Sequence, residues 1–480
     1  MSVLTRYRTR VAVVVAALLL PAMAPAAAGA ADTGDVLSVK SVVVPGVTPS
    51  VSLKEALSSQ AWRNWRADGG GDGAAGGVVA AETVGPARTA GRLAERPSAV
   101  PPSDGGGMSA AAPNPPVYPE PPRTMTLKEC LDGLATRPFV IKSKFAACSG
   151  ASFHQAWLRN GKPQGESRFI VVAIGTMPKN SRTITYTYHY TDMLTTGTAP
   201  TAGFLITTLP RHPQTWPSTA KRREGGTVPK TGVSFNQLKI LKTFQHTVTV
   251  DAGQGDKKKK DDRVFSVYEP LIKLTPPPGY TMNGAREGKL FMLPPRWDAA
   301  TYLHNKNGTA GKPATKGAAA FAYISILRYS AKAGAEEKAV ADHIRTAFQR
   351  PGATKPVNPN KSVPGGEAAR ALTRLYHDGK RHKRNRAAAV RTCVHYWGPN
   401  YTAGGKECDE FPFASTYQGA AQKTDEPSAP ADNYSALPLP KADNSKAGSM
   451  LGAFMDRYRI LDGLTSSPDT SDDAYFVVIS

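Results

Sequence analysis

Alternating apolar and polar residues dominate the middle of the chain, from about residue 125 to residue 330. The clearest run is 182–190, where Thr-Ile-Thr-Tyr-Thr-Tyr-His-Tyr repeats with the period of two that marks a strand with one buried face. Turn residues such as Asp251-Ala252-Gly253 separate the runs. Further strands are expected at 167–176, 203–209, 243–250, 263–274 and 318–329. Many short strands with such breaks predict a β-rich, sandwich-like domain over 125–350, and no catalytic constellation stands out within it.

The pattern changes to helical spacing after residue 335. Residues 336–349 predict a helix that ends at Arg350-Pro351-Gly352, and a Pro/Asn/Lys-rich linker is expected over 351–365. Helical character returns at 367–390, and 475–479 has the composition of a strand. Met450, Leu451, Phe454, Met455 and Tyr458 mark one further amphipathic helix. These elements predict a small α+β domain over 366–480.

The first 124 residues carry the composition of a leader and a linker. Arg6, Arg8 and Arg10 precede an apolar run at 11–20 that is too short to span a bilayer, so residues 1–30 are interpreted as a secretory signal peptide. Residues 31–124 follow as an N-terminal segment, either a propeptide or an early docking segment, and a Gly/Ala/Pro-rich linker expected to be disordered. The mature protein is therefore expected outside the cytoplasm, secreted or in contact with the cell wall.

Charge and cysteine usage narrow the class of protein. The net charge of +22 favours a polyanionic partner, which could be nucleic acid, teichoic acid or an anionic surface, with solubility and a general compositional bias as the alternative. Residues 366–407 contain nine Lys and Arg against three acids, which suits either a phosphodiester-binding face or a solvated helix.

The four cysteines fall into two local pairs. Local pairing is the simplest of three connectivities and gives each domain one disulfide, Cys130–Cys148 and Cys393–Cys408.

Polar chemistry is densest at Asp409-Glu410 and around Asn444. Hydrolysis of a phosphodiester needs a base for water and a cation on the phosphate, and Mg²⁺ or Mn²⁺ binds carboxylate and amide oxygens. Neighbours in a regular strand point to opposite faces, so both acids can serve one site only from a loop or bulge. Asn444 lies near a helix start, where it or Asp443 is a helix cap or, alternatively, Asn444 is a metal ligand.

Two motifs in this order resemble the NucA/NucB-type family of secreted bacterial deoxyribonucleases. They are Cys408-Asp409-Glu410-Phe411-Pro412-Phe413-Ala414 with Tyr417-Gln418-Gly419, and Ala442-Asp443-Asn444 with Ala447-Gly448-Ser449-Met450-Leu451-Gly452. The resemblance implies a metal-dependent, non-sequence-specific endonuclease related to His-Me finger (ββα-metal) enzymes, with an acid in place of the histidine base. It places Asp409 or Glu410 as the base and Asn444 with Glu410 at the metal. Substrate contacts are expected from Arg384, Arg386, Gln418, Lys446 and Arg457.

One departure leaves the roles of the acids open. Family members often carry another acid two residues before the Asp-Glu pair, and Glu407 stands there. We expect a monomeric secreted endonuclease acting on extracellular DNA, with RNA as an open alternative substrate. The rival interpretations are a non-catalytic envelope-binding protein and an exported nuclease toxin with an immunity protein.

Overall fold

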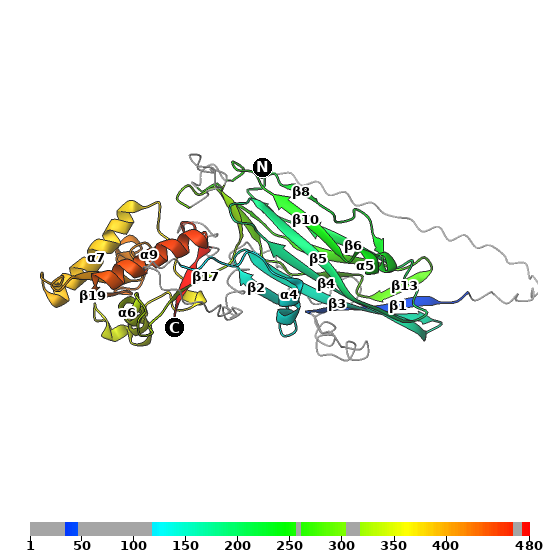
Figure 1. Cartoon of the computed structure of the whole chain (residues 1–480), viewed down its shortest axis with the longest axis horizontal. Coiled ribbons are helices and arrows are strands. Elements are labelled where there is room, and N and C mark those ends of the chain that lie inside the picture. Colours follow the sequence, from blue (N-terminus) through cyan, green and yellow to red (C-terminus); the bar gives the residue numbers. More distant parts are fainter. Residues whose placement is uncertain (1–33, 47–117, 256–260, 304–316, 464–472) are drawn as a thin grey trace, which may run out of the picture.

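The computed structural model describes residues 34–46, 118–255, 261–303, 317–463 and 473–480. The expected signal peptide and most of the Gly-rich linker lie outside these residues. The described chain has a long β-rich part and a smaller part with helices around a short hairpin, placed end to end (Figure 1). No helix among the described residues has the length and apolar character needed to cross a bilayer.

The described residues of the β-rich part form three sheets. The largest has eight strands in the order β13-β1-β3-β4-β5-β10-β8, with β2 pairing β3. Two four-stranded sheets follow the orders β16-β15-β11-β7 and β14-β12-β6-β9. Their strands are β1 (Leu37–Pro45), β2 (Phe139–Ser143), β3 (Ala146–Arg159), β4 (Lys162–Thr176), β5 (Thr183–Gly197), β6 (Leu205–Arg211), β7 (Thr215–Trp216), β8 (Arg223–Gly226), β9 (Val233–Ser234), β10 (Thr243–Thr249), β11 (Val264–Ser266), β12 (Glu269–Thr275), β13 (Tyr280–Gly284), β14 (Glu287–Lys289), β15 (Pro295–Asp298) and β16 (Ala318–Phe321).

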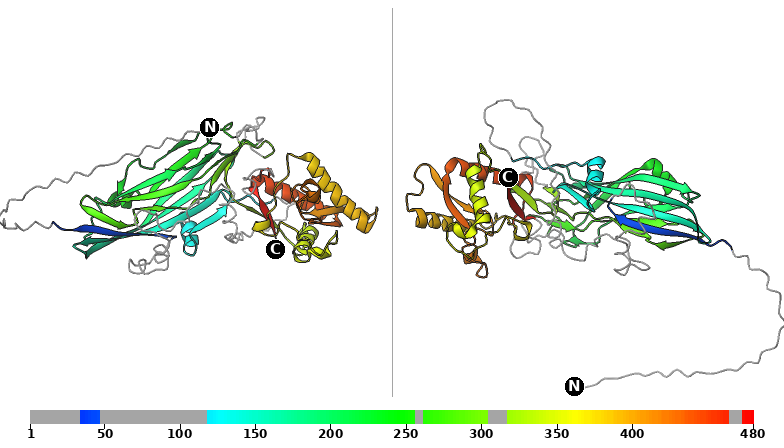
Figure 2. Two further views of the ribbon diagram at one scale, coloured as in Figure 1. Left: turned by 180° about the vertical axis from the view of Figure 1, so that it is seen from behind. Right: turned by 90° about the horizontal axis from the view of Figure 1, so that it is seen from below.

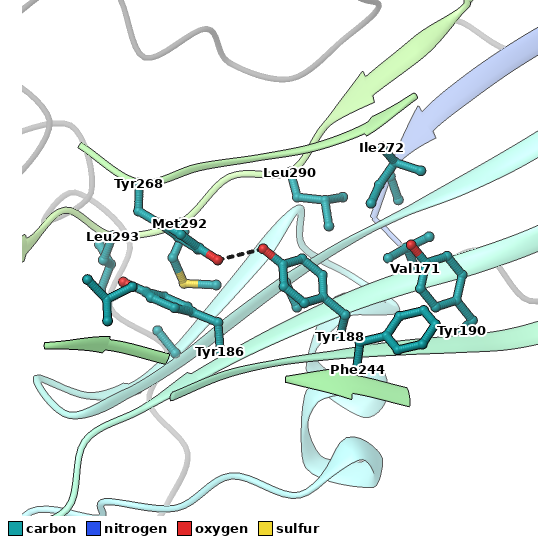
Figure 3. Close-up of a cluster of buried hydrophobic side chains, with 14 of the residues drawn as sticks. Val171, Tyr186, Tyr188, Tyr190, Phe244, Tyr268, Ile272, Leu290, Met292 and Leu293 are labelled. Atoms are coloured by element: carbon teal, nitrogen blue, oxygen red, sulfur yellow. Dashed lines mark hydrogen bonds between the residues drawn. The ribbon is translucent and has the colours of Figure 1, made fainter. Parts of the chain in front are cut away.

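One apolar core joins these sheets, and the alternation in β5 shows why they pack. Tyr186, Tyr188 and Tyr190 lie two residues apart, so all three side chains point to the same face and are fully buried. Tyr268 from the segment before β12 stacks on Tyr186 with ring centroids 3.7 Å apart, and its hydroxyl lies 2.6 Å from that of Tyr188 (Figure 3). The β-rich character that the alternation predicts is confirmed.

Two short helices complete this part, α4 (Leu127–Leu134) and α5 (Phe235–Leu241). Thr126 caps α4 in a reciprocal capping box with Glu129. The Cys130–Cys148 disulfide joins α4 to β3, as the local pairing predicted.

The smaller part holds the C-terminal elements. They are β17 (Ser325–Tyr329), α6 (Lys338–Gln349), η1 (Pro351–Ala353), η2 (Ala368–Arg370), α7 (Gly379–Trp397), β18 (Lys406–Phe411), α8 (Gln422–Asp425), β19 (Ser435–Pro440), α9 (Lys441–Arg457) and β20 (Tyr475–Ile479). β18 and β19 form an antiparallel hairpin, and β17 pairs in parallel with β20. Buried side chains of β17, α6, β18, α9 and β20 share one core.

The structural units differ from the expected boundaries in three places. β1 pairs with β3 and β13 inside the large sheet, so a strand from the expected N-terminal segment belongs to the β-rich part (Figure 2). β17 and α6 pack in the C-terminal core, although the alternation had placed them in the β-rich domain. The expected linker 351–365 is packed, because the buried Lys361 ammonium donates to the carbonyls of Thr354, Pro356 and Tyr434.

One expected helix also starts later than predicted. Residues 371–378 are not helical, since α7 begins at Gly379 and the Asp378 side chain accepts from the Arg381 backbone N–H as its cap.

Buried ion pairs join the two parts. Asp473, which precedes β20, lies 2.5 Å from Lys144 and 2.5 Å from Arg296 of the β-rich part. Asp298 of β15 lies 2.5 Å from Arg459, which follows α9. All of these side chains are at most 3% exposed, so the contact between the parts is a closed interface.

Candidate active site

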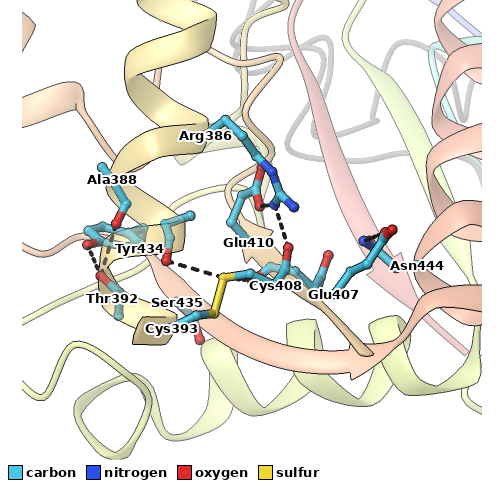
Figure 4. Close-up of a disulfide and its surroundings, with 12 residues drawn as sticks. Arg386, Ala388, Thr392, Cys393, Glu407, Cys408, Glu410, Tyr434, Ser435 and Asn444 are labelled. Atoms are coloured by element: carbon cyan, nitrogen blue, oxygen red, sulfur yellow. Dashed lines mark hydrogen bonds and ion pairs between the residues drawn. A yellow bond between two sulfur atoms is a disulfide. The ribbon is translucent and has the colours of Figure 1, made fainter. Parts of the chain in front are cut away.

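The hairpin β18–β19 carries the acidic motif, and strand alternation divides its side chains between two faces. Cys408 and Glu410 contact α7 on one face. Glu407 and Asp409 contact α9 and α6 on the other. Figure 4 shows Arg386 against Glu410 beside the disulfide, with Asn444 reaching Glu407 from the other side. The backbone is a regular strand here, so the two adjacent acids do not share a site.

The α7 face is a structural clamp. The Cys393–Cys408 disulfide confirms the second local pairing, and the Arg386 guanidinium donates to both the Glu410 carboxylate and the Cys408 carbonyl. Burial raises the pKa of Glu410 to about 7; the Arg386 charge opposes this rise and the Asp409 charge adds to it. Glu410 is thus enclosed between its strand and α7, and its side chain is only 9% exposed.

The α9 face places Asn444 beside an acid. The Asn444 Nδ2 donates to the Glu407 Oε2 over 3.2 Å, and the Lys441 ammonium lies 3.4 Å from the other oxygen of Glu407. The helix starts at Lys441 after Pro440, so Asn444 lies within the first turn and caps nothing. Ala447, Leu451, Phe454 and Met455 anchor the opposite side of α9 in the core and leave this turn facing the hairpin.

A histidine from α6 reaches Asp409. The His343 Nδ1 lies 2.6 Å from the Asp409 Oδ2, and its Nε2 lies 2.7 Å from the Ser435 Oγ on β19. Both members of the pair are buried, with side chains 2% and 7% exposed. Sequence reasoning missed His343; its one signal was a polar residue at a core-facing position of the predicted helix, which alone names no partner.

The donor set on the α9 face suits a divalent ion that keeps most of its water. Glu407 and Asn444 supply a carboxylate and an amide oxygen, which are the hard ligands that Mg²⁺ prefers. Among the residues that the structure describes, no group of three or more His, Cys, Asp and Glu forms a protein cage for a metal. The expected pair of Asn444 with Glu410 does not come together, because Glu410 faces α7.

The five expected substrate contacts lie in different surroundings. Arg384 and Arg386 are on α7; Arg384 pairs with Asp425 at 2.5 Å and keeps 42% of its side chain exposed. The others are engaged away from Asn444: Gln418 with Thr373, Lys446 with Glu336 at 2.6 Å, and Arg457 with the Tyr118 carbonyl and Glu120.

Comparison with known proteins assigns a family to this part of the chain. Residues 362–465 match the family model described as deoxyribonuclease NucA/NucB. No curated protein and no solved structure matches the chain. The matched segment contains α7, the β18–β19 hairpin and α9, and it begins after α6.

Proposed function

Since residues 362–465 carry a deoxyribonuclease domain of the NucA/NucB family and the chain is therefore a nuclease, we propose that it is a secreted endonuclease. It hydrolyses phosphodiester bonds of extracellular DNA with a divalent metal ion and without sequence specificity. The observation that carries this proposal is the contact of Asn444 with Glu407, a carboxylate on the same face of β18 as Asp409.

Asp409 is the general base in this proposal. It projects from the same face of β18 as Glu407, two residues away, toward the helices that cover that face. Glu410 is turned toward α7 and held by Arg386. Of the two acids, only Asp409 shares a face with Asn444, and its carboxylate accepts the proton of the attacking water.

Glu407 and Asn444 are the groups that would hold the metal. This replaces the expected pair of Glu410 and Asn444 with the pair that the strand geometry brings together. A bound Mg²⁺ or Mn²⁺ supplies charge stabilisation to the phosphate and to the leaving oxygen. Lys441, 3.4 Å from Glu407, limits the negative charge that gathers around the two oxygens.

The exposed side of α7, on the hairpin face opposite Asp409, supplies a surface that attracts the DNA backbone to the domain. The helix contains no acidic residue, and it exposes Lys380, Lys383, Arg384 and Arg391. Neutralising phosphates with such side chains gives affinity that is independent of base sequence and falls with salt. This agrees with a nuclease that does not select a sequence.

The test is digestion of plasmid DNA by the full-length mature protein, with and without chelator, followed by addition of Mg²⁺ or Mn²⁺. We expect chelated enzyme to be inactive and either ion to restore cleavage. Asp409→Asn should lower kcat by roughly 10²–10⁴-fold, the usual contribution of a general base. Glu407→Gln and Asn444→Ala should raise the metal concentration needed for half-maximal activity.

Glu410→Gln is the matched control, because it changes an adjacent acid of the same strand on the opposite face. We expect its kcat to stay within a few-fold of the parent. Full activity of Asp409→Asn, or metal-independent cleavage, would refute the proposal. Single-stranded RNA of equal length, digested in parallel, determines the preference between the two sugars.

A further inference from the structure

We infer that His343 of α6 is a positioning residue that holds the Asp409 carboxylate in the orientation its role as base requires. The inference rests on the proposed function. It adds to the nuclease site a side chain that lies 19 residues before the first residue matched by the family model, residue 362.

Hydrogen-bond chemistry fixes the direction of this contact. An ionised carboxylate only accepts hydrogen bonds, so the Nδ1–H of His343 donates to the Asp409 Oδ2 over 2.6 Å. In the neutral ring the Nε2 then accepts from the Ser435 hydroxyl, 2.7 Å away. The imidazole is therefore held from both ends, by side chains of β18 and β19.

The arrangement leaves one carboxylate oxygen available. His343 engages Oδ2, and the Asp409 side chain retains 7% exposure. A base acts only when its free oxygen lies within hydrogen-bond reach of the proton that it removes. Fixing Oδ2 prevents rotation of the carboxyl group, so the second oxygen keeps one direction.

Burial of the His343 imidazole destabilises the fold unless its hydrogen bonds form. Val340, Ala341, Ile344 and Ala347 line the same buried face of α6. An imidazole placed among such residues loses its hydration, and only its hydrogen bonds compensate. An apolar residue at this position would fill the core without a desolvation penalty, but it could not orient Asp409.

Two amide substitutions separate positioning from packing. In His343→Asn the amide nitrogen takes the place of Nδ1, so the donor to Asp409 remains while the contact with Ser435 is lost. In His343→Gln the longer side chain carries its nitrogen toward the place of Nε2, so the Ser435 contact remains and the Asp409 donor is lost. Both substitutions put one neutral amide into the same buried space.

The experiment compares steady-state cleavage of DNA by full-length parent, His343→Asn, His343→Gln and Ser435→Ala, with melting temperatures measured alongside. We expect kcat of His343→Gln to fall roughly 10–100-fold with KM within about 3-fold of the parent, since misplacement of a catalytic group acts on the chemical step. His343→Asn and Ser435→Ala should keep kcat within about 5-fold of the parent on the same reasoning.

Equal kcat for the Asn and Gln variants, or a His343→Gln defect confined to KM, would overturn the inference. The Asp409→Asn variant distinguishes a failure of this inference from a failure of the proposed function. If Asp409→Asn is inactive and both His343 variants are fully active, only the positioning role falls. If Asp409→Asn is fully active, Asp409 is not the base, and the positioning role of His343 is wrong as well.

Discussion

Replacing Asp473 with Asn should destabilise the whole molecule, because this carboxylate of the C-terminal part neutralises two buried cations of the β-rich part. Its Oδ1 lies 2.5 Å from the Lys144 ammonium and 2.5 Å from the Arg296 guanidinium. The three side chains are 0–1% exposed, so neither cation can turn to water after the change. The amide keeps the volume of the side chain and removes only its charge.

The magnitude follows from this burial. Removing one partner of a buried ion pair costs about 3–5 kcal/mol, because buried positive charge loses a compensating carboxylate. Arg296 keeps its ion pair with Asp298 at 2.5 Å, so the lower end of this range is expected. For a large domain that loss lowers the melting temperature by roughly 6–20 °C. Burial alone would raise the pKa of Asp473, but Arg296, Lys144 and Arg263 together hold it well below the ordinary carboxyl value. The stabilisation is therefore complete above the ordinary carboxyl pKa of about 4 and is lost as the pH falls below it.

Urea unfolding at pH 7, with a thermal scan, measures the effect. Asp132→Asn is the matched control, since Asp132 forms an ion pair of similar length, 2.7 Å, with Lys128, but the two side chains are 63% and 83% exposed. We expect the control to change the free energy of unfolding by less than about 0.5 kcal/mol. A loss for Asp473→Asn no larger than that for Asp132→Asn, or an effect undiminished at pH 2, would contradict this prediction.

Three further outcomes are expected. Burial raises the pKa of Glu410 to about 7 from its ordinary 4.5. As the pH rises, the unfolded chain therefore loses the Glu410 proton at a lower pH than the folded chain does. The free energy of unfolding should then fall by up to about 3 kcal/mol as the pH rises from 4.5 to 7, and Glu410→Gln should flatten this profile in urea titrations. Cys408→Ser opens a disulfide whose cysteines are 15 residues apart and should lower stability by about 3 kcal/mol in chemical denaturation; a smaller loss on reduction of the parent would contradict this. The isolated fragment 366–480 lacks β17 and α6 of its own core, so circular dichroism should show it poorly folded; a cooperative melt of the fragment would show that these elements are dispensable.

The sequence pattern identified those elements whose two faces differ. The alternation at 182–190 predicted β5, and the helical spacing at 336–349 predicted α6 to within two residues. The two disulfides followed from local spacing, and the paired motifs led to the nuclease family that the comparison then confirmed. The sequence pattern did not predict β3, because nearly every one of its positions is buried. A strand that is covered on both faces shows no alternation of apolar and polar residues.

Only part of the candidate active site follows from local sequence pattern, because contacts made by tertiary packing leave no signal along the chain. Local rules located Asp409, Glu410 and Asn444, and the period of a strand already warned that adjacent acids point apart. The contact on which we base the choice of Asp409, that of Asn444 with Glu407, depends on how α9 packs against the hairpin. His343 is 66 residues from Asp409 along the chain, and only the tertiary fold brings them together.

The parallel pairing of β17 with β20 also sets when this enzyme can first be assembled. β20 starts at residue 475 and β17 at residue 325, so at about 5–20 residues per second a ribosome needs roughly 8–30 s to make the second strand after the first. α6, the hairpin and α9 are made within that interval, and their shared core stays incomplete until β20 follows. If the chain is exported unfolded, its nuclease core would stay incomplete during export. Cleavage of DNA would then begin only after β20 has crossed the membrane.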